Sequence, residues 1–427
     1  MTAALNIAIV GSGIAGLASA WLLGRRHAVT LFERHPRPGM GAFNVDSVDG
    51  GAPARIDLPL RVFKSGYYDT LMALYRAAGV RMQPTDHAAA FTTPQGDTYF
   101  RYRNLRLGAL SMPVPSAVTA RGAGIAREAL RLMLTAPRDL ARGRARGLSL
   151  DDYLRQQGYS AAFVEGMLLP SFAAICTCSY EAVRRYPADV IIGFFSSGSL
   201  FGGTWRARHG ADDAIRRLLQ GCRTLRNDAE VVALRRADEG IDVLEADGRR
   251  TRFDHVVLAV QAHQAAVLAT PLDPASAALL SRVPHESSEV VVHGDPALVP
   301  TSARRAPVHF QVDPAAARPM ANIHLNRLIP ELAGRAPLFQ TWHPLVAPRE
   351  ETVLARARFE RPVVTLDSQS AMAQLRANQN REAPASAARL WFAGSYLMPG
   401  IPLLESAAQS AQQVAARLGV VAPWVRA

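Results

Sequence analysis

Three glycines near the start of the chain have the spacing of a dinucleotide-binding turn. Gly11, Gly13 and Gly16 lie between a short run of branched apolar residues and a segment of helical character. The first glycine permits a tight turn, the second lets the backbone approach a pyrophosphate, and the third lets the helix pack closely on the strand. The phosphates would then lie at the positive end of the helix dipole. The pattern therefore predicts a βαβ unit that binds a dinucleotide.

An acid in the right place extends this pattern. Glu33 ends the second apolar run, residues 28–32, where a carboxylate can accept hydrogen bonds from the adenosine ribose. NAD and FAD carry the same ribose, so Glu33 does not discriminate between them. The segment 37–41 resembles the R-x-G-G element of FAD proteins of the glutathione-reductase and amine oxidase class. A buried strand ending at Gly394, followed by a long helix, resembles the C-terminal return that closes over the flavin in that class.

The elements needed to position this motif alternate along the chain. Besides the opening strand (6–10), helix (17–24) and strand (28–32), we expect helices within 115–160, at 212–220 and at 404–418, a strand meander at 230–234, 241–245 and 251–260, strands at 290–293, 308–312 and 390–393, and a loop over 295–320. These elements predict an α/β fold, with a Rossmann-like FAD-binding domain interleaved with an α+β substrate domain. The predicted FAD-binding domain comprises residues 1–85, 205–275 and 385–427, and the substrate domain comprises 86–204 and 276–384.

Composition limits the class of protein. A chain of 427 residues suggests two domains, and no apolar run reaches the length of about 18 residues needed to cross a bilayer. Three cysteines indicate a reducing, cytoplasmic location. The net charge is +12, but the arginines are scattered and no nucleic-acid motif is present. The arginine-rich, partly amphipathic stretch 121–147 could contact a membrane surface or be a solvated face. The oligomeric state cannot be predicted.

The order of segments across nearly the whole chain resembles one family. Residues 170–200, 253–265 and 290–300 are similar to a largely uncharacterised family of NAD/FAD-binding flavoproteins within the FAD-dependent amine oxidase superfamily. Some of its members are encoded beside fatty-acid-modifying enzymes. The resemblance implies FAD contacts at Gly11, Gly13, Ile14, Ala15, Gly16, Glu33, Arg37, Gly41, Leu60, Arg61, Val231, Gly394, Ser395 and Leu404.

Departures from the relatives bear on the substrate and on FAD attachment. Ser395 stands where relatives commonly place an acid, and Leu403 stands where monoamine oxidases have a tyrosine of their aromatic cage. No cysteine follows Cys222, so we expect non-covalent FAD. We expect Leu403 and Phe63 to line an apolar substrate pocket.

No catalytic residue can be assigned, although two are weak candidates. Lys64 could place a positive charge near the flavin, but we expect it to point to solvent because lysine is rarely buried unpaired. His293 could face the substrate as an acid or base. We expect Cys176 and Cys178 to pack in a core and Asp212 and Asp213 to begin a helix. No metal-binding spacing occurs, and no metal site is expected.

The expected reaction is hydride removal from a carbon of a small lipophilic substrate, as in a desaturase or amine oxidase. Oxidation of an amine or pyrroline substrate is the second hypothesis. A non-catalytic flavoprotein or an NAD-dependent reductase is an alternative of a different class.

Overall fold

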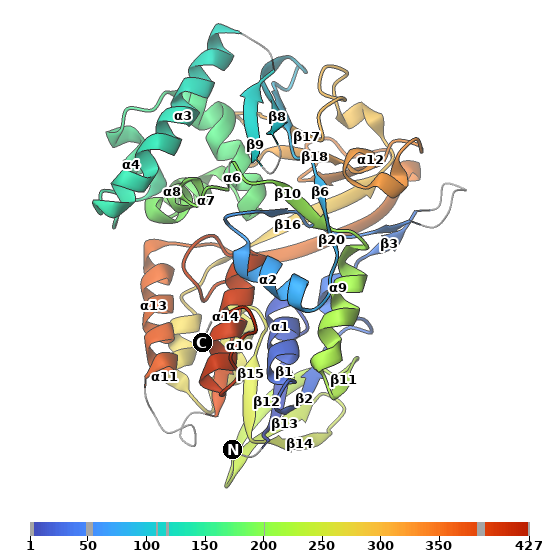
Figure 1. The fold of residues 1–427 in the computed structure, drawn as a ribbon, viewed down its shortest axis with the longest axis vertical. Helices are drawn as coiled ribbons and strands as arrows, with labels where there is room; N and C mark the ends of the chain where they lie inside the picture. The colour runs from blue at the N-terminus through green and yellow to red at the C-terminus, as the bar shows by residue number, and fades with distance from the viewer. Residues whose placement is uncertain are drawn as a thin grey trace.

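The computed structural model describes residues 4–47, 54–107, 110–116, 119–199, 201–381 and 389–425. Two layered regions are stacked along the long axis of the molecule (Figure 1). The lower region is built on a parallel sheet and contains both ends of the described chain. The upper region is built on a larger, mainly antiparallel sheet.

The parallel sheet has five strands in the order β11-β2-β1-β15-β21. Its strands are β1 (Asn6–Val10), β2 (Ala28–Phe32), β11 (Thr224–Arg226), β15 (His255–Leu258) and β21 (Leu390–Phe392). Helix α1 (Ile14–Leu23) is buried along its whole length and packs against α14 (Leu404–Arg417). The predicted strands 6–10 and 28–32 and the final helix are confirmed. Helix α1 begins at Ile14, three residues before the predicted start, because the glycine turn leads into the helix directly.

The predicted strand 251–260 is wrong as a single element. Strand β14 (Arg250–Phe253) completes an antiparallel meander with β12 (Val231–Ala237) and β13 (Gly240–Glu245). The chain then turns at Asp254, whose carboxylate accepts a hydrogen bond of 2.7 Å from the Asn6 backbone N–H. Strand β15 follows and pairs with β1 in the parallel sheet. Apolar residues occur on both sides of this turn, so the sequence pattern does not reveal it.

The upper sheet has eight strands in the order β20-β16-β19-β18-β17-β7-β8-β9. They are β7 (Ala89–Thr92), β8 (Thr98–Leu107), β9 (Leu110–Pro115), β16 (His285–His293), β17 (Val308–Gln311), β18 (Met320–His324), β19 (Phe339–Trp342) and β20 (Val353–Pro362). Strand β17 agrees with the predicted strand 308–312 and interrupts the loop expected over 295–320. Helices gather at one end of this region: α3 (Ala120–Ala141), α4 (Leu150–Gln156), α6 (Leu169–Cys176), α7 (Tyr180–Arg185) and α8 (Ala188–Ser196) (Figure 1).

Short elements connect the two regions. Strands β5 (Phe63–Lys64), β6 (Met82–Thr85) and β10 (Thr204–Ala207) form a small sheet, flanked by α2 (Asp69–Ala77) and α9 (Gly210–Leu218). Helices α10 (Ala262–Ala269), α11 (Pro274–Leu280) and α13 (Leu366–Asn380) complete the lower region. The strands of the parallel sheet come from distant parts of the chain. The boundaries proposed for the two domains stay a prediction.

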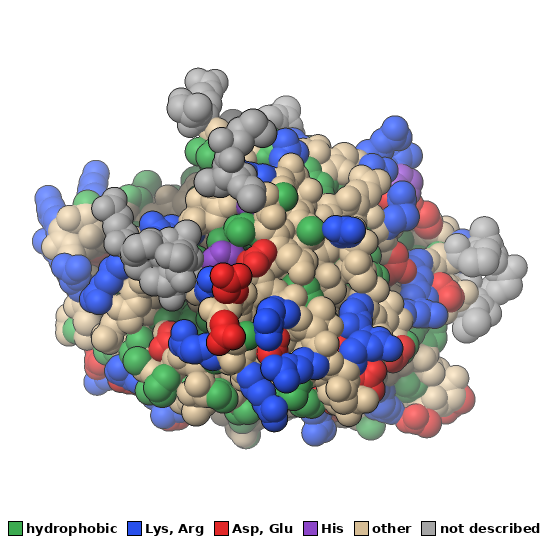
Figure 2. Space-filling view, turned by 90° about the horizontal axis from the view of Figure 1, so that it is seen from below, with side chains coloured by type: hydrophobic (Ala, Val, Ile, Leu, Met, Phe, Trp, Pro, Cys, Tyr) green, Lys and Arg blue, Asp and Glu red, His purple; other side chains and the backbone are tan. Residues whose placement is uncertain are grey.

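At one end of the molecule, the charged side chains are mixed as on an ordinary solvent-exposed surface. At the lower end of the molecule, Lys and Arg side chains are interspersed with Asp and Glu (Figure 2). Arg250 and Arg252 of this region both pair with Asp242. No helix in the described part of the chain is long and apolar enough to cross a membrane.

Candidate cofactor site

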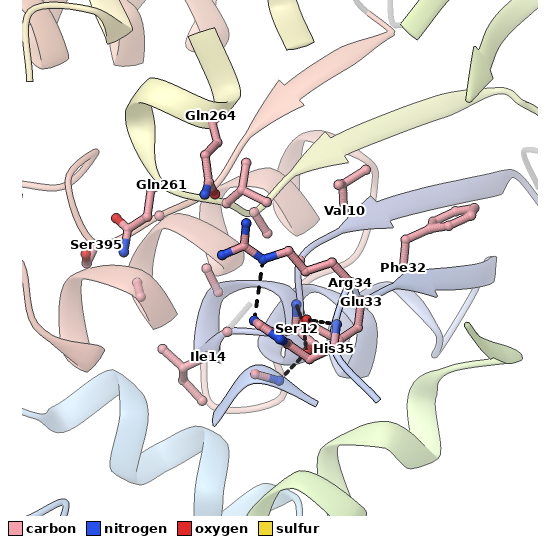
Figure 3. A pocket seen from close by; sticks show the side chains of 18 of the residues that line it. Val10, Ser12, Ile14, Phe32, Glu33, Arg34, His35, Gln261, Gln264 and Ser395 are labelled. Atoms are coloured by element: carbon pink, nitrogen blue, oxygen red, sulfur yellow. Dashed lines mark hydrogen bonds between the residues drawn. The ribbon is translucent and has the colours of Figure 1, made fainter. Parts of the chain in front are cut away.

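A cavity of about 660 Å³ opens at the carboxyl ends of β1, β2 and β15. Ligands of open parallel sheets bind at this edge, outside the ends of the strands. Figure 3 shows Ser12, Glu33 and His35 on one side of the cavity and, on the other, Gln264 of α10 and Gln261, which precedes this helix. The volume lies within the range typical of small-molecule and cofactor sites.

The glycine turn forms the wall of the cavity next to α1. Gly11 adopts a φ of 97°, which only glycine adopts readily, and a Cβ at this position would lie 2.8 Å from the Ala259 carbonyl oxygen. At Gly13, in contrast, a Cβ would meet nothing within 4 Å, because this residue faces the cavity. No side chain caps the N-terminus of α1. Its first N–H groups are therefore free to bind an anion, which fits the pyrophosphate of a dinucleotide.

Glu33 joins the end of β2 to this turn. Its carboxylate accepts hydrogen bonds from the backbone N–H of Ser12 at 3.2 Å, from the Ser12 hydroxyl, and from the His35 backbone N–H at 2.9 Å. The Ser12 hydroxyl oxygen also accepts a bond of 2.6 Å from the Gly39 N–H. Glu33 is almost fully buried and lines the cavity, where its remaining acceptor capacity is available to a ribose hydroxyl.

The opposite end of the cavity is formed by the C-terminal return. Gly394 and Ser395 follow β21, and Leu403 and Leu404 lie at the start of α14; all four line the cavity, as does Val231 of β12. The Gly394 N–H is held by the Ser410 hydroxyl at 2.9 Å, which fixes the turn against α14. The structure therefore brings together residues from positions 11–33, 231 and 394–404 around one space.

Several predicted cofactor residues do not line this cavity. Gly16 lies behind the turn and packs on Gly11. Arg37 and Gly41 line a neighbouring hollow together with Asp212 of α9. Leu60 and Arg61 are half-buried outside the cavity lining, where the Leu60 N–H donates to the Gln340 side chain at 2.8 Å and Arg61 donates to the Met40 carbonyl at 2.6 Å. Contacts of FAD with these residues stay predictions.

The expected position of Phe63 is wrong. Phe63 is 1% exposed and packs in the core of the lower region against Tyr68 and Tyr75, because pairing of β5 with β10 turns its ring away from the cavity. Lys64 is half-buried at the end of β5, so its predicted orientation to solvent stays a prediction. Burial lowers its pKa, and the nearby carboxylate of Asp86 opposes this effect.

His293 does not face the cavity either. It is fully buried in β16 and takes part in a chain of hydrogen bonds across the upper sheet. The chain runs from His293 to Thr341 (2.7 Å), Asn322 (2.5 Å), His309 (3.0 Å) and Thr92 (2.8 Å). Burial lowers the pKa of both His293 and His309 to about 4. These neutral histidines join strands, so the expectation that His293 acts as an acid or base on the substrate is wrong.

Sequence reasoning missed residues that the fold brings to the cavity from afar. Ser12 lies inside the glycine motif, but its bond to Glu33 depends on the tertiary fold. Phe359 and Arg361 of β20 line the cavity although they lie more than 300 residues from the glycine turn. Nothing in their local sequence indicates a site, since β20 alternates between charged and apolar residues like any partly exposed strand.

The remaining sequence expectations concern packing. Cys176 and Cys178 are buried in the core of the upper region, as expected. Asp212 and Asp213 lie in the first turn of α9, also as expected. In the described ranges, no group of three or more His, Cys, Asp or Glu side chains could hold a metal ion.

Comparison with known proteins supports this fold. Residues 9–78 match the model of an NAD(P)-binding Rossmann-like domain. No curated protein sequence matches the chain. Three similar solved structures are a fatty acid isomerase from P. acnes (16% identity, TM-score 0.70, 98% of this chain and 100% of that one), a putrescine oxidase (15%, 0.64, 98% and 99%) and cyclohexylamine oxidase from Brevibacterium oxydans (14%, 0.65, 97% and 98%). The chain therefore has the same fold as these three structures, with a Rossmann-like domain at residues 9–78, which confirms the predicted fold class.

Proposed function

We propose that this chain is an FAD-dependent oxidoreductase that removes a hydride from a carbon of a lipophilic substrate. The main support for this proposal is the cavity, because its two ends differ in chemical character. Its glycine-turn end fits a pyrophosphate, and its other end has an apolar wall that includes Leu403 and Phe359. FAD bound there would accept the hydride, and its reoxidation by oxygen or another acceptor would complete the cycle.

The residues of the chain position the two reactants. The α1 N-terminus and Glu33 would fix the dinucleotide, while Gly394 and Ser395 would hold the part next to the flavin. Leu403 packs against the apolar core of the upper region, so a substrate beside it would be shielded from water. Such shielding favours hydride transfer over side reactions.

Oxidation of an amine is the second candidate, because two of the similar structures are named as amine oxidases. The third is named as a fatty acid isomerase and supports a lipophilic substrate. Leu403 supplies no aromatic ring at its position, so it cannot attract a small cation through a cation–π contact.

Anaerobic mixing with two homologous series tests the proposal. Alkyl amines and acyl compounds of increasing chain length are added to the purified holoprotein, and loss of the oxidised flavin absorption is followed. We expect bleaching that becomes more effective with chain length. Best turnover of putrescine would favour the amine candidate, and no bleaching by any compound would favour a non-catalytic flavoprotein.

We also propose that α3 gives the protein a peripheral membrane contact. Leu130 and Leu134 are exposed on this helix among exposed arginines such as Arg127 and Arg138. Apolar and basic side chains on one exposed face are typical of helices that lie in an anionic lipid interface. Helix α3 is at the outer edge of the upper region, away from the parallel sheet (Figure 1).

A further inference from the structure

A guanidinium group without a partner lies in the wall of the cavity. Arg361, near the end of β20, lines the cavity on the same face of the strand as Phe359, two residues earlier. Within the described ranges, no carboxylate forms an ion pair with Arg361 and no group accepts a hydrogen bond from its guanidinium. Arg361 is half-buried. Charges that are partly removed from water are normally paired, so an unpaired guanidinium in a cavity wall indicates a ligand that supplies the negative charge.

The acids around Arg361 are already engaged. Glu286 is its cross-strand neighbour on β16, Glu360 precedes it in sequence, and Glu405 lies in the first turn of α14. Their partners are Arg318 and Ser179 for Glu286, His263 at 3.5 Å for Glu360, and the backbone N–H groups of Thr70 and Leu71 at 3.0 and 2.9 Å for Glu405. None of these carboxylates is free to neutralise Arg361.

A second arginine lies near Arg361. Arg61 lies close enough to Arg361 to lower its pKa further, after burial, which is the larger cause. Arg61 has its own neighbours, since it donates to the Met40 carbonyl and lies near the buried carboxyl of Asp57. Arginine stays protonated even when buried, so Arg361 presents an uncompensated charge to the cavity.

The position of Arg361 favours substrate over the FAD pyrophosphate as the anion. The free N–H groups that fit a pyrophosphate lie at Gly13, on the wall formed by α1. Arg361 instead lies near Cys176 and Tyr186, which belong to the core of the upper region. Leu403, which lines the same cavity, packs against that core as well.

We propose that Arg361 binds the oxyanion head group, a carboxylate or a phosphate, of an amphipathic substrate whose apolar chain lies against Leu403 and Phe359. The proposal rests on the proposed function and narrows its substrate class. A planar guanidinium can bind either oxyanion with two parallel hydrogen bonds. An alkyl amine would place a second positive charge beside Arg361, and an alcohol would leave the arginine unneutralised.

Four probes with one chain length test the proposal: decanoate, decyl phosphate, decylamine and decanol. Each is titrated into the holoprotein, with binding measured by the change in flavin absorption and by thermal shift. We expect decanoate or decyl phosphate to bind more tightly than decanol and decylamine. Arg361→Met should raise the Kd of the preferred anion by about 10- to 100-fold and leave that of decanol unchanged. Arg358→Met is the matched control, since Arg358 is exposed on the same strand, and it should change neither value.

Other variants and outcomes keep the result unambiguous. Arg361→Lys retains the charge and should keep the preference for an anion at reduced affinity. Equal binding of decanoate, decyl phosphate and decanol to the wild type would overturn the proposal without any variant. So would loss of FAD from Arg361→Met with its preference for an anion intact, because the arginine would then hold the cofactor. Absence of flavin from the wild type would defeat the proposed function instead, and the thermal shifts would still report the head-group preference.

Discussion

Gly16 of α1 packs directly on Gly11, such that a Cβ at Gly16 would lie 1.9 Å from the Gly11 carbonyl oxygen. No side chain can occupy that space without moving the turn. At Gly13, three residues earlier, a Cβ would meet nothing within 4 Å. Two glycines of one motif therefore serve different purposes: Gly16 lets the helix approach the strand, and Gly13 leaves room for a ligand.

The two glycines should respond differently to substitution. Gly13→Asp should leave the protein folded but abolish FAD binding, because its carboxylate would occupy the position of the pyrophosphate and repel it. Gly16→Val should lower the thermal stability in addition to FAD binding, because its side chain clashes with the backbone of Gly11. FAD retained after desalting and the unfolding midpoint measure the two effects. Wild-type FAD content in Gly13→Asp would show that the pyrophosphate lies elsewhere.

Leu403 should control the preference for chain length. If the cavity buries an apolar chain beside it, each added methylene contributes about 0.8 kcal/mol, or about a fourfold gain in affinity. Leu403→Tyr should reduce this gain by placing a ring and a hydroxyl in the path of the chain. Steady-state KM values over a homologous series measure this gain per methylene.

Leu345→Met is a useful comparison, since it keeps an apolar side chain of similar size at an exposed position outside the cavity. Its KM values should follow those of the wild type. A wild-type KM that is independent of chain length, with short polar amines turned over best, would contradict the lipophilic pocket.

Membrane contact through α3 should depend on its exposed leucines. Liposome flotation with anionic and with neutral lipids should show the wild type rising with anionic liposomes only, and Leu130→Glu/Leu134→Glu remaining at the bottom. Val346→Glu changes an exposed apolar residue outside α3 and should float like the wild type. If the wild type stays at the bottom with both kinds of liposome, α3 is a solvated face.

The sequence predicted the glycine turn well because strand, turn, helix and acid are contiguous there. It failed where long-range pairing decides the direction of a side chain. Phe63 points into the lower core because β5 pairs with β10, which lies 140 residues later in the chain. Arg361 reaches the cavity because β20 pairs with β16, and this pairing places its side chain near the carboxyl ends of the parallel strands. Neither pairing leaves a local pattern that hydrophobic periodicity could detect.

The buried histidines should make the fold sensitive to acid. The pKa of His293 and His309 is lowered by burial from 6.5 to about 4. The native state therefore favours the neutral rings, and their contribution to stability is complete above pH 6.5 and lost as the pH falls towards 4. We expect the free energy of unfolding to decrease over this window by about 1–3 kcal/mol for each histidine. Urea denaturation at a series of pH values measures it.

His309→Gln separates this effect from general acid denaturation. Glutamine can still bond to Asn322 or Thr92 but does not titrate, so the variant should show a shallower dependence on pH. His209→Gln alters an exposed histidine and should keep the wild-type slope. If His309→Gln has the same dependence of unfolding free energy on pH as the wild type, protonation of His309 does not account for the loss of stability in acid.

The central claim is that the cavity between the glycine turn and the C-terminal return holds FAD without a covalent bond. Cys222 lies in the lower region next to Val29, its sulfur 3.7 Å from that residue's carbonyl oxygen, and no cysteine follows it in the sequence. Acid precipitation of the purified yellow protein, followed by chromatography of the supernatant, tests the claim directly. We expect FAD in the supernatant at close to one equivalent per chain. A colourless protein that binds NAD, or flavin that remains with the precipitate, would contradict it.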